Sequence, residues 1–173
     1  MIMRTRVLLI AFSAAAACHA VVPMALAGTA ESHAATKRQE HAAGDEVRKQ
    51  FSARGVLIRA ERYKDGKLND GPGGEPAVQN FSAEGIVIFA GRFKAGKRHD
   101  GPGGEPAIQR FSDTGKLVYA ARYRDDKLND GPNGEPAIQQ FNLGGTLIYA
   151  MRYRHGQITA VEEGGKTTPI GPS

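Results

Sequence analysis

The chain has a single cysteine, no tryptophan and few aromatic residues, which make up 7% of its 173 positions. One cysteine cannot form an internal disulfide, a four-cysteine zinc site or an iron–sulfur cluster. The low aromatic content and the 22 glycines favour turn-rich β structure over a helical bundle. The length fits one modest domain behind an export segment and is too short for a large enzyme.

Residues 1–27 have the features of a secretory signal peptide. Two positive charges precede an almost entirely apolar stretch, and residues 25–27 (Ala-Leu-Ala) provide the small side chains that precede a cleavage site. A membrane anchor, or a lipoprotein signal ending at Cys18, is the alternative interpretation. Pro23 and the small-residue exit favour cleavage after Ala27. We therefore expect an exported protein, periplasmic or secreted, with lipid anchoring through Cys18 as the alternative.

The exported chain would carry a mild positive charge. Cleavage removes two cations and no acid, so the net charge falls from +5 to +3. This excess supports attraction to anionic surfaces but is too small to indicate nucleic-acid binding. Residues 28–44 contain no large aliphatic or aromatic side chain and are expected to form a flexible linker.

A sequence unit repeats at regular intervals after this linker. Its phenylalanines recur at Phe51, Phe81, Phe111 and Phe141, and the fourth copy stops two thirds of the way through. Each unit contains a short strand ending at the phenylalanine, a tight turn, and a longer strand rich in β-branched and aromatic residues. The sequence predicts an all-β domain over residues 45–160, an array of antiparallel β-hairpins in a twisted or coiled repeat sheet, with a flexible tail at 161–173.

The pairing register can be derived from the turns. A turn from Ser82 to Gly85 places Phe81 opposite Ile86 and Glu75 opposite Arg92. The same rule predicts three further ion pairs: Asp45 with Arg62, Glu105 with Arg122, and Glu135 with Arg152. We expect these structural pairs rather than an anion-binding ladder of arginines. The long strand then ends in a two-residue turn, as at Asp65-Gly66, and both sheet faces are partly apolar, so the sheet must twist, coil or pack against a partner.

A second set of cations has no acid opposite in this register: Lys64, Lys94, Arg124 and Arg154. Each follows an aromatic residue: Tyr63, Phe93, Tyr123 and Tyr153. Alternating cations and rings could contact lipid head groups or an acidic partner. The alternatives are a solvated strand edge for the cations and the core of the coiled sheet for the rings.

Metal binding and catalysis have little support in the sequence. Asp70, Asp100 and Asp130 lie in glycine-rich loops, each with a glutamate five residues on, and could offer oxygen ligands to a weak calcium site. Their spacing matches neither the EF-hand loop nor the calcium-binding nonapeptide, and hydrogen bonds to the turn backbone are the expected role. No nucleophile has a recognisable base partner, and no cluster has metal-ligand spacing. We expect no metal, no cofactor and no enzymatic activity, with an active site of unrecognised pattern as a third alternative.

The run Tyr63-x-Asp65-Gly66-Lys67-Leu68, followed by Gly71, Phe81 and Gly85, resembles the variant MORN (membrane occupation and recognition nexus) repeat, and in particular the antitoxin-type bacterial MORN-like family. The likeness covers residues 45–160, although the period is longer than is usual in that family and Pro72, Pro102 and Pro132 stand where it often has an aromatic residue. The resemblance implies a scaffolding, membrane-associating or protein-associating role, and in some members toxin neutralisation.

The sequence thus predicts an exported, non-enzymatic repeat module that binds an unidentified protein or an anionic envelope surface. Free edge strands would also allow self-association. The alternative function, an antitoxin or immunity-type protein that neutralises a toxin, rests only on the resemblance.

Overall fold

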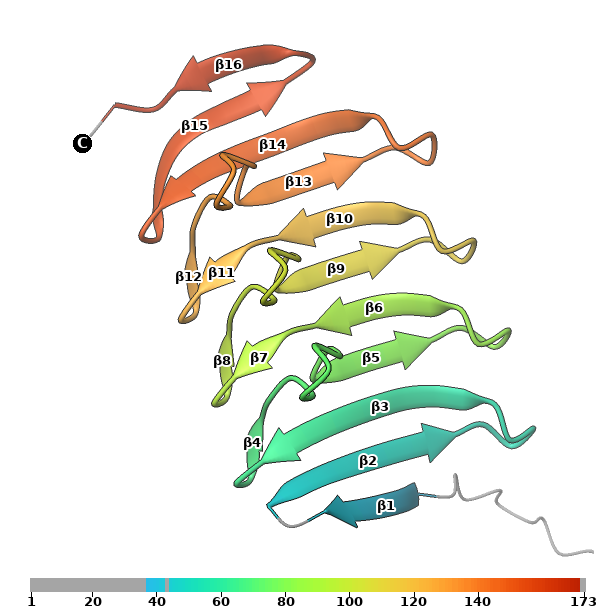
Figure 1. The fold of residues 1–173 in the computed structure, drawn as a ribbon. Helices are drawn as coiled ribbons and strands as arrows, with labels where there is room; N and C mark the ends of the chain where they lie inside the picture. Colours follow the sequence, from blue (N-terminus) through green and yellow to red (C-terminus); the bar gives the residue numbers. More distant parts are fainter. Residues whose placement is uncertain (1–36, 43, 172–173) are drawn as a thin grey trace, which may run out of the picture. The chain divides into compact units, whose positions relative to one another are not determined.

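The computed structural model describes residues 37–42 and 44–171 (Figure 1). The predicted signal peptide, including Cys18, and most of the predicted linker lie outside these residues. The described part of the chain is all-β, as the sequence predicts, and contains no helix that could cross a lipid bilayer.

Sixteen strands are described, and most of them join one open antiparallel sheet. Their bounds are β1 (Lys37–Ala42), β2 (Asp45–Phe51), β3 (Leu57–Lys64), β4 (Lys67–Leu68), β5 (Val78–Phe81), β6 (Val87–Gly91), β7 (Phe93–Lys94), β8 (Lys97–Arg98), β9 (Ile108–Phe111), β10 (Leu117–Ala121), β11 (Tyr123–Arg124), β12 (Lys127–Leu128), β13 (Ile138–Phe141), β14 (Leu147–Arg154), β15 (Gln157–Glu163) and β16 (Lys166–Pro169). The main sheet runs β1-β2-β3-β5-β6-β9-β10-β13-β14-β15-β16, with β4 attached to β3. The pairs β7-β8 and β11-β12 form two small separate ribbons.

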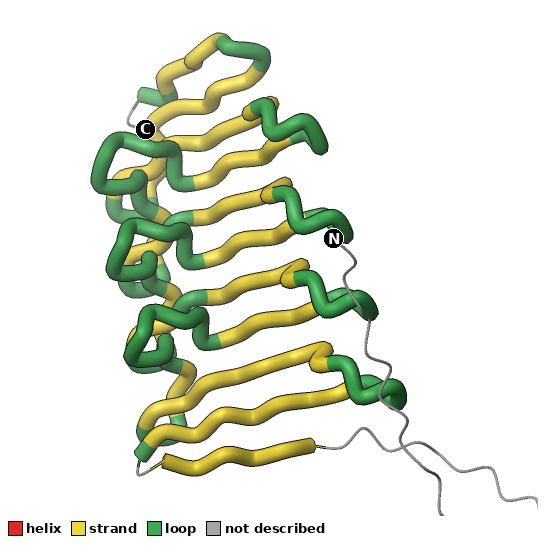
Figure 2. The backbone as a smooth tube through the Cα atoms, turned by 45° about the vertical axis from the view of Figure 1, so that its right-hand side comes forward, coloured by secondary structure: helices red, strands yellow, loops and turns green. Residues whose placement is uncertain are grey.

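The repeat of the sequence is visible as a repeat of hairpins along the sheet. Each unit adds one short and one long strand, such as β5 and β6, and the long strand leads into a small hairpin (Figure 1). Loops therefore gather in two columns, one at each side margin of the sheet (Figure 2). Equivalent side chains of successive units are brought to the same margin.

The small hairpins have the predicted two-residue turns. Both turn residues have positive φ, as a type I′ turn requires: 50° at Asp65 and 73° at Gly66, with similar values in the other three units. The pairing of Lys64 with Lys67 closes the first of these turns directly. The prediction made from the Asp-Gly dipeptide is confirmed.

The register of the long hairpins differs from the prediction by two residues over most of their length. The Ser82 N–H donates to the Ile86 carbonyl, and Gly85 has φ of 82°, so the loop holds three residues rather than two. A β-bulge follows, because Phe81 pairs with Val87 but Asn80 pairs with Phe89. A shift of two keeps every side chain on its predicted face while changing its partner.

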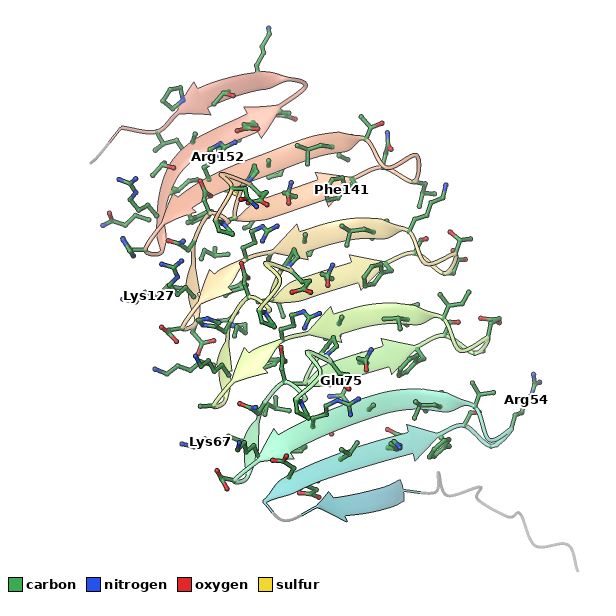
Figure 3. All side chains as sticks on the ribbon, viewed as in Figure 1. Arg54, Lys67, Glu75, Lys127, Phe141 and Arg152 are labelled. Carbon is green, nitrogen blue, oxygen red and sulfur yellow. The ribbon has the colours of Figure 1, made fainter. Side chains whose placement is uncertain are left out.

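The buried centre of the sheet is made of small side chains. Its buried hydrophobic residues are Val78 and nine alanines, of which Ala77, Ala107, Ala137 and Ala150 are completely inaccessible. On one face a row alternates glutamine and alanine across the strands, as in Ala90 opposite both Gln79 and Gln109. The phenylalanines at the strand ends, such as Phe141 in Figure 3, are only half-buried. A single-layer sheet leaves no second layer to enclose large rings.

Both ends of the sheet extend past the predicted limits. β1 lies within the predicted linker and pairs with β2 from Lys37 opposite Gln50 to Ala42 opposite Asp45. β15 runs to Glu163 and pairs with β16, within the predicted flexible tail. These strands were not predicted from the sequence because they contain few hydrophobic residues. An edge strand is held by backbone hydrogen bonds more than by side-chain burial.

Candidate functional site

Three glycine-proline loops, residues 70–76, 100–106 and 130–136, form part of one loop column (Figure 2). Each begins with an aspartate that connects it to the next unit. Asp100 Oδ1 accepts hydrogen bonds of 2.9 Å from the N–H groups of Ala107 and Tyr123. The Asp100 N–H donates to the Tyr123 carbonyl at 2.9 Å. Equivalent bonds are made by Asp70 and Asp130. The sequence prediction placed these aspartates on the turn backbone but missed the bond to the small hairpin of the next unit.

An arginine lies between consecutive loops. Arg122 is only 6% exposed, and its Nη1 donates to the Gly104 carbonyl at 2.6 Å and lies 3.4 Å from Asp100 Oδ2. Its Nη2 lies 3.7 Å from Glu135 Oε1 in the following loop. Arg92 contacts Gly74 and Asp70 in the same way. Each of these two arginines therefore joins an aspartate and a carbonyl of the preceding loop.

The four predicted ion pairs have the wrong partners. Asp45 lies opposite Lys64, and Val47 lies opposite Arg62. The carboxylates of Glu75 and Glu105 accept hydrogen bonds from N–H groups of their own loops, at Gly73 and Gly103, instead of pairing with Arg92 and Arg122. Arg152 binds Glu162 at 2.5 Å and lies 3.5 Å from Asp130 rather than pairing with Glu135 (Figure 3). The two-residue change in register and the folding of each glutamate into its loop explain all four corrections.

Burial raises the pKa of Asp70 and of Asp100. Desolvation is the main cause, and it outweighs the N–H donors and the nearby arginine, which favour the charged form. These carboxylates are therefore more easily protonated than aspartates in water.

The stability of the protein relative to an Asp100→Asn variant should depend on pH. A raised folded-state pKa gives a contribution that is fully present below the unfolded value of about 3.9 and is lost as the pH rises through the folded-state pKa. The difference between the free energies of unfolding of the parent and the variant should shift in favour of the parent as the pH falls from 7 toward 4. Urea denaturation at several pH values measures this difference. A constant difference across the range would contradict the expected role of burial.

The predicted cations Lys64, Lys94, Arg124 and Arg154 all lie at one margin of the sheet and are exposed. The register places another cation directly opposite three of them: Lys67 opposite Lys64, Lys97 opposite Lys94, and Lys127 opposite Arg124. On its other side Lys64 lies opposite Asp45 of β2, so the expectation that no acid faces this lysine is wrong. Figure 3 shows Lys67 and Lys127 at this margin, pointing away from the strands. We call the seven side chains the basic column. The sequence prediction omits Lys67, Lys97 and Lys127, because it pairs the cations with residues of the neighbouring loop and not across their own turns.

The aromatic residues that precede the cations are half-buried. The guanidinium of Arg48 lies 4.4 Å from the ring centroid of Tyr63, and that of Arg98 lies 4.2 Å from the centroid of Tyr123. A Cβ placed on Gly91 would lie 3.1 Å from Phe89 and 3.2 Å from Phe93, so this glycine gives the two rings room. The rings support the hairpins from one side. Their partial burial is intermediate between an exposed row of rings and the sheet core that was the alternative prediction for them.

Three of the four predicted aromatic–cation pairs line pockets beside the loops. Tyr63 and Lys64 line one of about 350 Å³, Phe93 and Lys94 one of about 310 Å³, and Tyr123 and Arg124 one of about 200 Å³. Each also contains the aspartate and the proline of a glycine-proline loop. Tyr153 and Arg154 belong to the incomplete fourth copy, after which no further such loop follows in the sequence.

Asparagine side chains connect the loops to the small hairpins. Asn69 Oδ1 accepts from the Ala95 N–H at 3.0 Å, and Asn129 Oδ1 accepts from the His155 N–H at 3.1 Å. His99 takes this position in the middle unit, where its Nδ1 lies 3.6 Å from Asp125 Oδ1 and has no hydrogen-bond partner among the described residues. No sequence signal singles out these connecting positions.

Among the residues that the structure describes, no group of three or more His, Cys, Asp or Glu side chains is placed to hold a metal ion. No protein-family model matches the chain, and neither a curated protein nor a solved structure is significantly similar to it.

Proposed function

We propose that this chain is an exported, non-enzymatic binding module whose basic column binds an anionic surface of the cell envelope. The proposal joins the predicted export signal to an exposed array of like charges. Repeat arrays offer broad surfaces suited to such binding.

The like-charge pairs carry the proposal. Two cations directly opposite each other destabilise a hairpin by roughly 0.2 to 1 kcal/mol, yet three successive hairpins contain such a pair. The four turns, residues 64–67, 94–97, 124–127 and 154–157, hold seven cations and three acids. One of these acids, Asp126, is bound to Arg98 at 2.8 Å. An anionic ligand would remove the repulsion that the fold leaves in place.

The spacing of the column suits an extended anionic surface. The long strands of neighbouring units have one short strand between them in the main sheet, which places the turns that continue them roughly 10 Å apart. The aliphatic stem of Lys67 approaches Gly96 of the next turn, and that of Lys127 approaches Gly156. The charges thus follow one another along the margin without large gaps.

The column can be tested with vesicles of anionic and zwitterionic lipid. A variant with Lys64, Lys94, Arg124 and Arg154 replaced by Gln should bind anionic vesicles at least tenfold more weakly at low salt. The upper bound is roughly a thousandfold if each cation contributes about 1 kcal/mol. Binding by the parent should weaken as salt is added, because exposed charges are screened beyond about 8 Å at physiological ionic strength. Sedimentation with vesicles measures both effects, and circular dichroism checks the fold.

A matched control changes the net charge by the same amount elsewhere. Arg54, Arg110, Lys116 and Lys166 are exposed and lie outside the column. Their replacement by Gln should leave most of the binding intact. An equal loss in both variants would show that net charge alone matters, and salt-independent binding would exclude the column.

A further inference from the structure

The first unit has an arginine that lacks the partners its equivalents have. Arg92 and Arg122 each donate through Nη1 to a carbonyl of the preceding loop and lie 3.4 Å from an aspartate carboxylate in it. Arg62 occupies the same place in the first unit, one repeat before Arg92. Its side chain makes no hydrogen bond or ion pair to the described residues. Its Nε is buried without a partner, as are those of Arg92 and Arg122, so the difference lies in its Nη groups.

The missing partners trace to the lead-in sequence. The position one repeat before Gly74 is Gly44, whose φ of 86° resembles the 83° of Gly74. The chain before Gly44 forms β1 rather than a glycine-proline loop, and the Gly44 carbonyl accepts from the Asp65 N–H at 3.1 Å. The carbonyl that would have served Arg62 is therefore bound elsewhere.

A pocket opens where that loop would lie. The cavity of about 350 Å³ is lined by Arg62 together with Val47, Tyr63, Lys64 and Pro72, among others. The two equivalent pockets farther along the sheet have neither Arg92 nor Arg122 in their lining. In those units the preceding loop accepts hydrogen bonds from the arginine, whereas Arg62 lines an accessible space.

The carboxylates that line the pocket do not bind the Arg62 side chain. Asp70 is bound by the N–H groups of Ala77 and Phe93, and Glu75 by that of Gly73. Asp45 and Glu46 also contribute to the lining. Arg92 lies beside Glu105 of its own following loop and still binds a carbonyl and a carboxylate of the preceding loop. An arginine at this position can therefore lie beside the glutamate of the following loop and still bind two acceptors on its other side.

From this internal comparison we propose that the Arg62 pocket is a binding site for a carboxylate carried next to a peptide carbonyl. The ligand would supply to Arg62 what Asp70 and Gly74 supply to Arg92. An Nη group of a guanidinium carries two N–H donors in fixed directions, so one nitrogen can serve both acceptors, as Nη1 of Arg92 does. The ligand is not expected to be a loop of a second copy, because the loop of residues 130–136 is already bound by Arg152 through the Gly134 carbonyl at 2.8 Å. This site shares Lys64 with the basic column but is centred on Arg62, and it takes a discrete ligand rather than a surface.

The test uses the full unmodified chain, labelled with ¹⁵N, and follows the side-chain Nε–H signals of its arginines. N-acetylglycine is the probe, since it carries a carboxylate and an amide carbonyl. The Arg62 signal, identified by its loss in Arg62→Lys, should shift and saturate, while those of Arg92 and Arg122 stay in place as internal controls. Calorimetry should show binding at least tenfold weaker in Arg62→Lys, which keeps the charge but not the planar guanidinium. Stronger binding of N-acetylglycine than of N-acetylglutamate α-amide would assign the site to a chain terminus, and the reverse would assign it to an acidic side chain.

Three results would overturn the proposal. An equal response to N-acetylglycinamide would show that the carboxylate is not recognised, and an equal response to inorganic phosphate would show a general anion site. Parallel shifts at all arginines, or no shift at Arg62, would show that the pocket does not bind this class of ligand. These outcomes are independent of the vesicle experiment, because the parent chain retains its whole basic column.

Discussion

Replacing Asp100 by Ala is expected to lower the free energy of unfolding by about 3 to 5 kcal/mol. Two backbone N–H groups, of Ala107 and Tyr123, would lose their acceptor, at roughly 1 to 3 kcal/mol each where they stay buried. Arg122, which is 6% exposed, would also lose a nearby carboxylate. Removing one partner of a buried charge pair is strongly destabilising.

Two further variants isolate the cause. Asp100→Asn keeps the Oδ1 acceptor for both N–H groups and should cost less than Asp100→Ala. Asp113→Ala changes an exposed aspartate in a hairpin turn and should have almost no effect. Equilibrium denaturation in urea measures all three, and equal losses for the Ala and Asn variants would show that the backbone hydrogen bonds at Asp100 contribute little.

The hairpin array could be predicted because its signals are local. Phenylalanines that recur once per unit, turn dipeptides such as Asp65-Gly66, and β-branched strands each act on neighbouring backbone. The register depended on one loop length. Three residues between Ser82 and Ile86, rather than two, together with the bulge after Val87, moved every charge to a new partner. A pattern of complementary charges was therefore consistent with a register that the backbone does not adopt.

The contacts between units could not be predicted in the same way. Asp100 binds the N–H of Tyr123, and backbone groups are identical in every residue, so no second side chain marks the contact. Arg122 binds a carbonyl for the same reason. The opposed lysines, such as Lys64 and Lys67, could have been found by applying the two-residue turn rule to their own positions. The lysines that complete the basic column could therefore have been predicted from the sequence.

A single-layer sheet with alanine at its centre must gain its stability from contacts between neighbouring units, because no large side chain among the described residues is fully buried. Such contacts recur once in every repeat, as Asp70 with Phe93, Asp100 with Tyr123, and Asp130 with Tyr153. One complete unit should therefore be removable without changing how the remaining units meet.

Deleting residues 81–110 is expected to give a folded, shorter array. The deletion joins Asn80 to Phe111, so the strand still ends in a phenylalanine, and Arg122 meets Asp70 and the Gly74 carbonyl in place of Asp100 and Gly104. The urea m-value should fall by roughly a fifth, in proportion to the surface lost, with a lower melting temperature. Deleting only residues 81–95 joins Asn80 to Gly96, removes the long strand β6 together with β7 of the small hairpin, and should abolish folding. Circular dichroism and denaturation distinguish the two variants. An unfolded chain after the whole-unit deletion, or a folded chain after the half-unit deletion, would show that stability does not reside in the contacts between units.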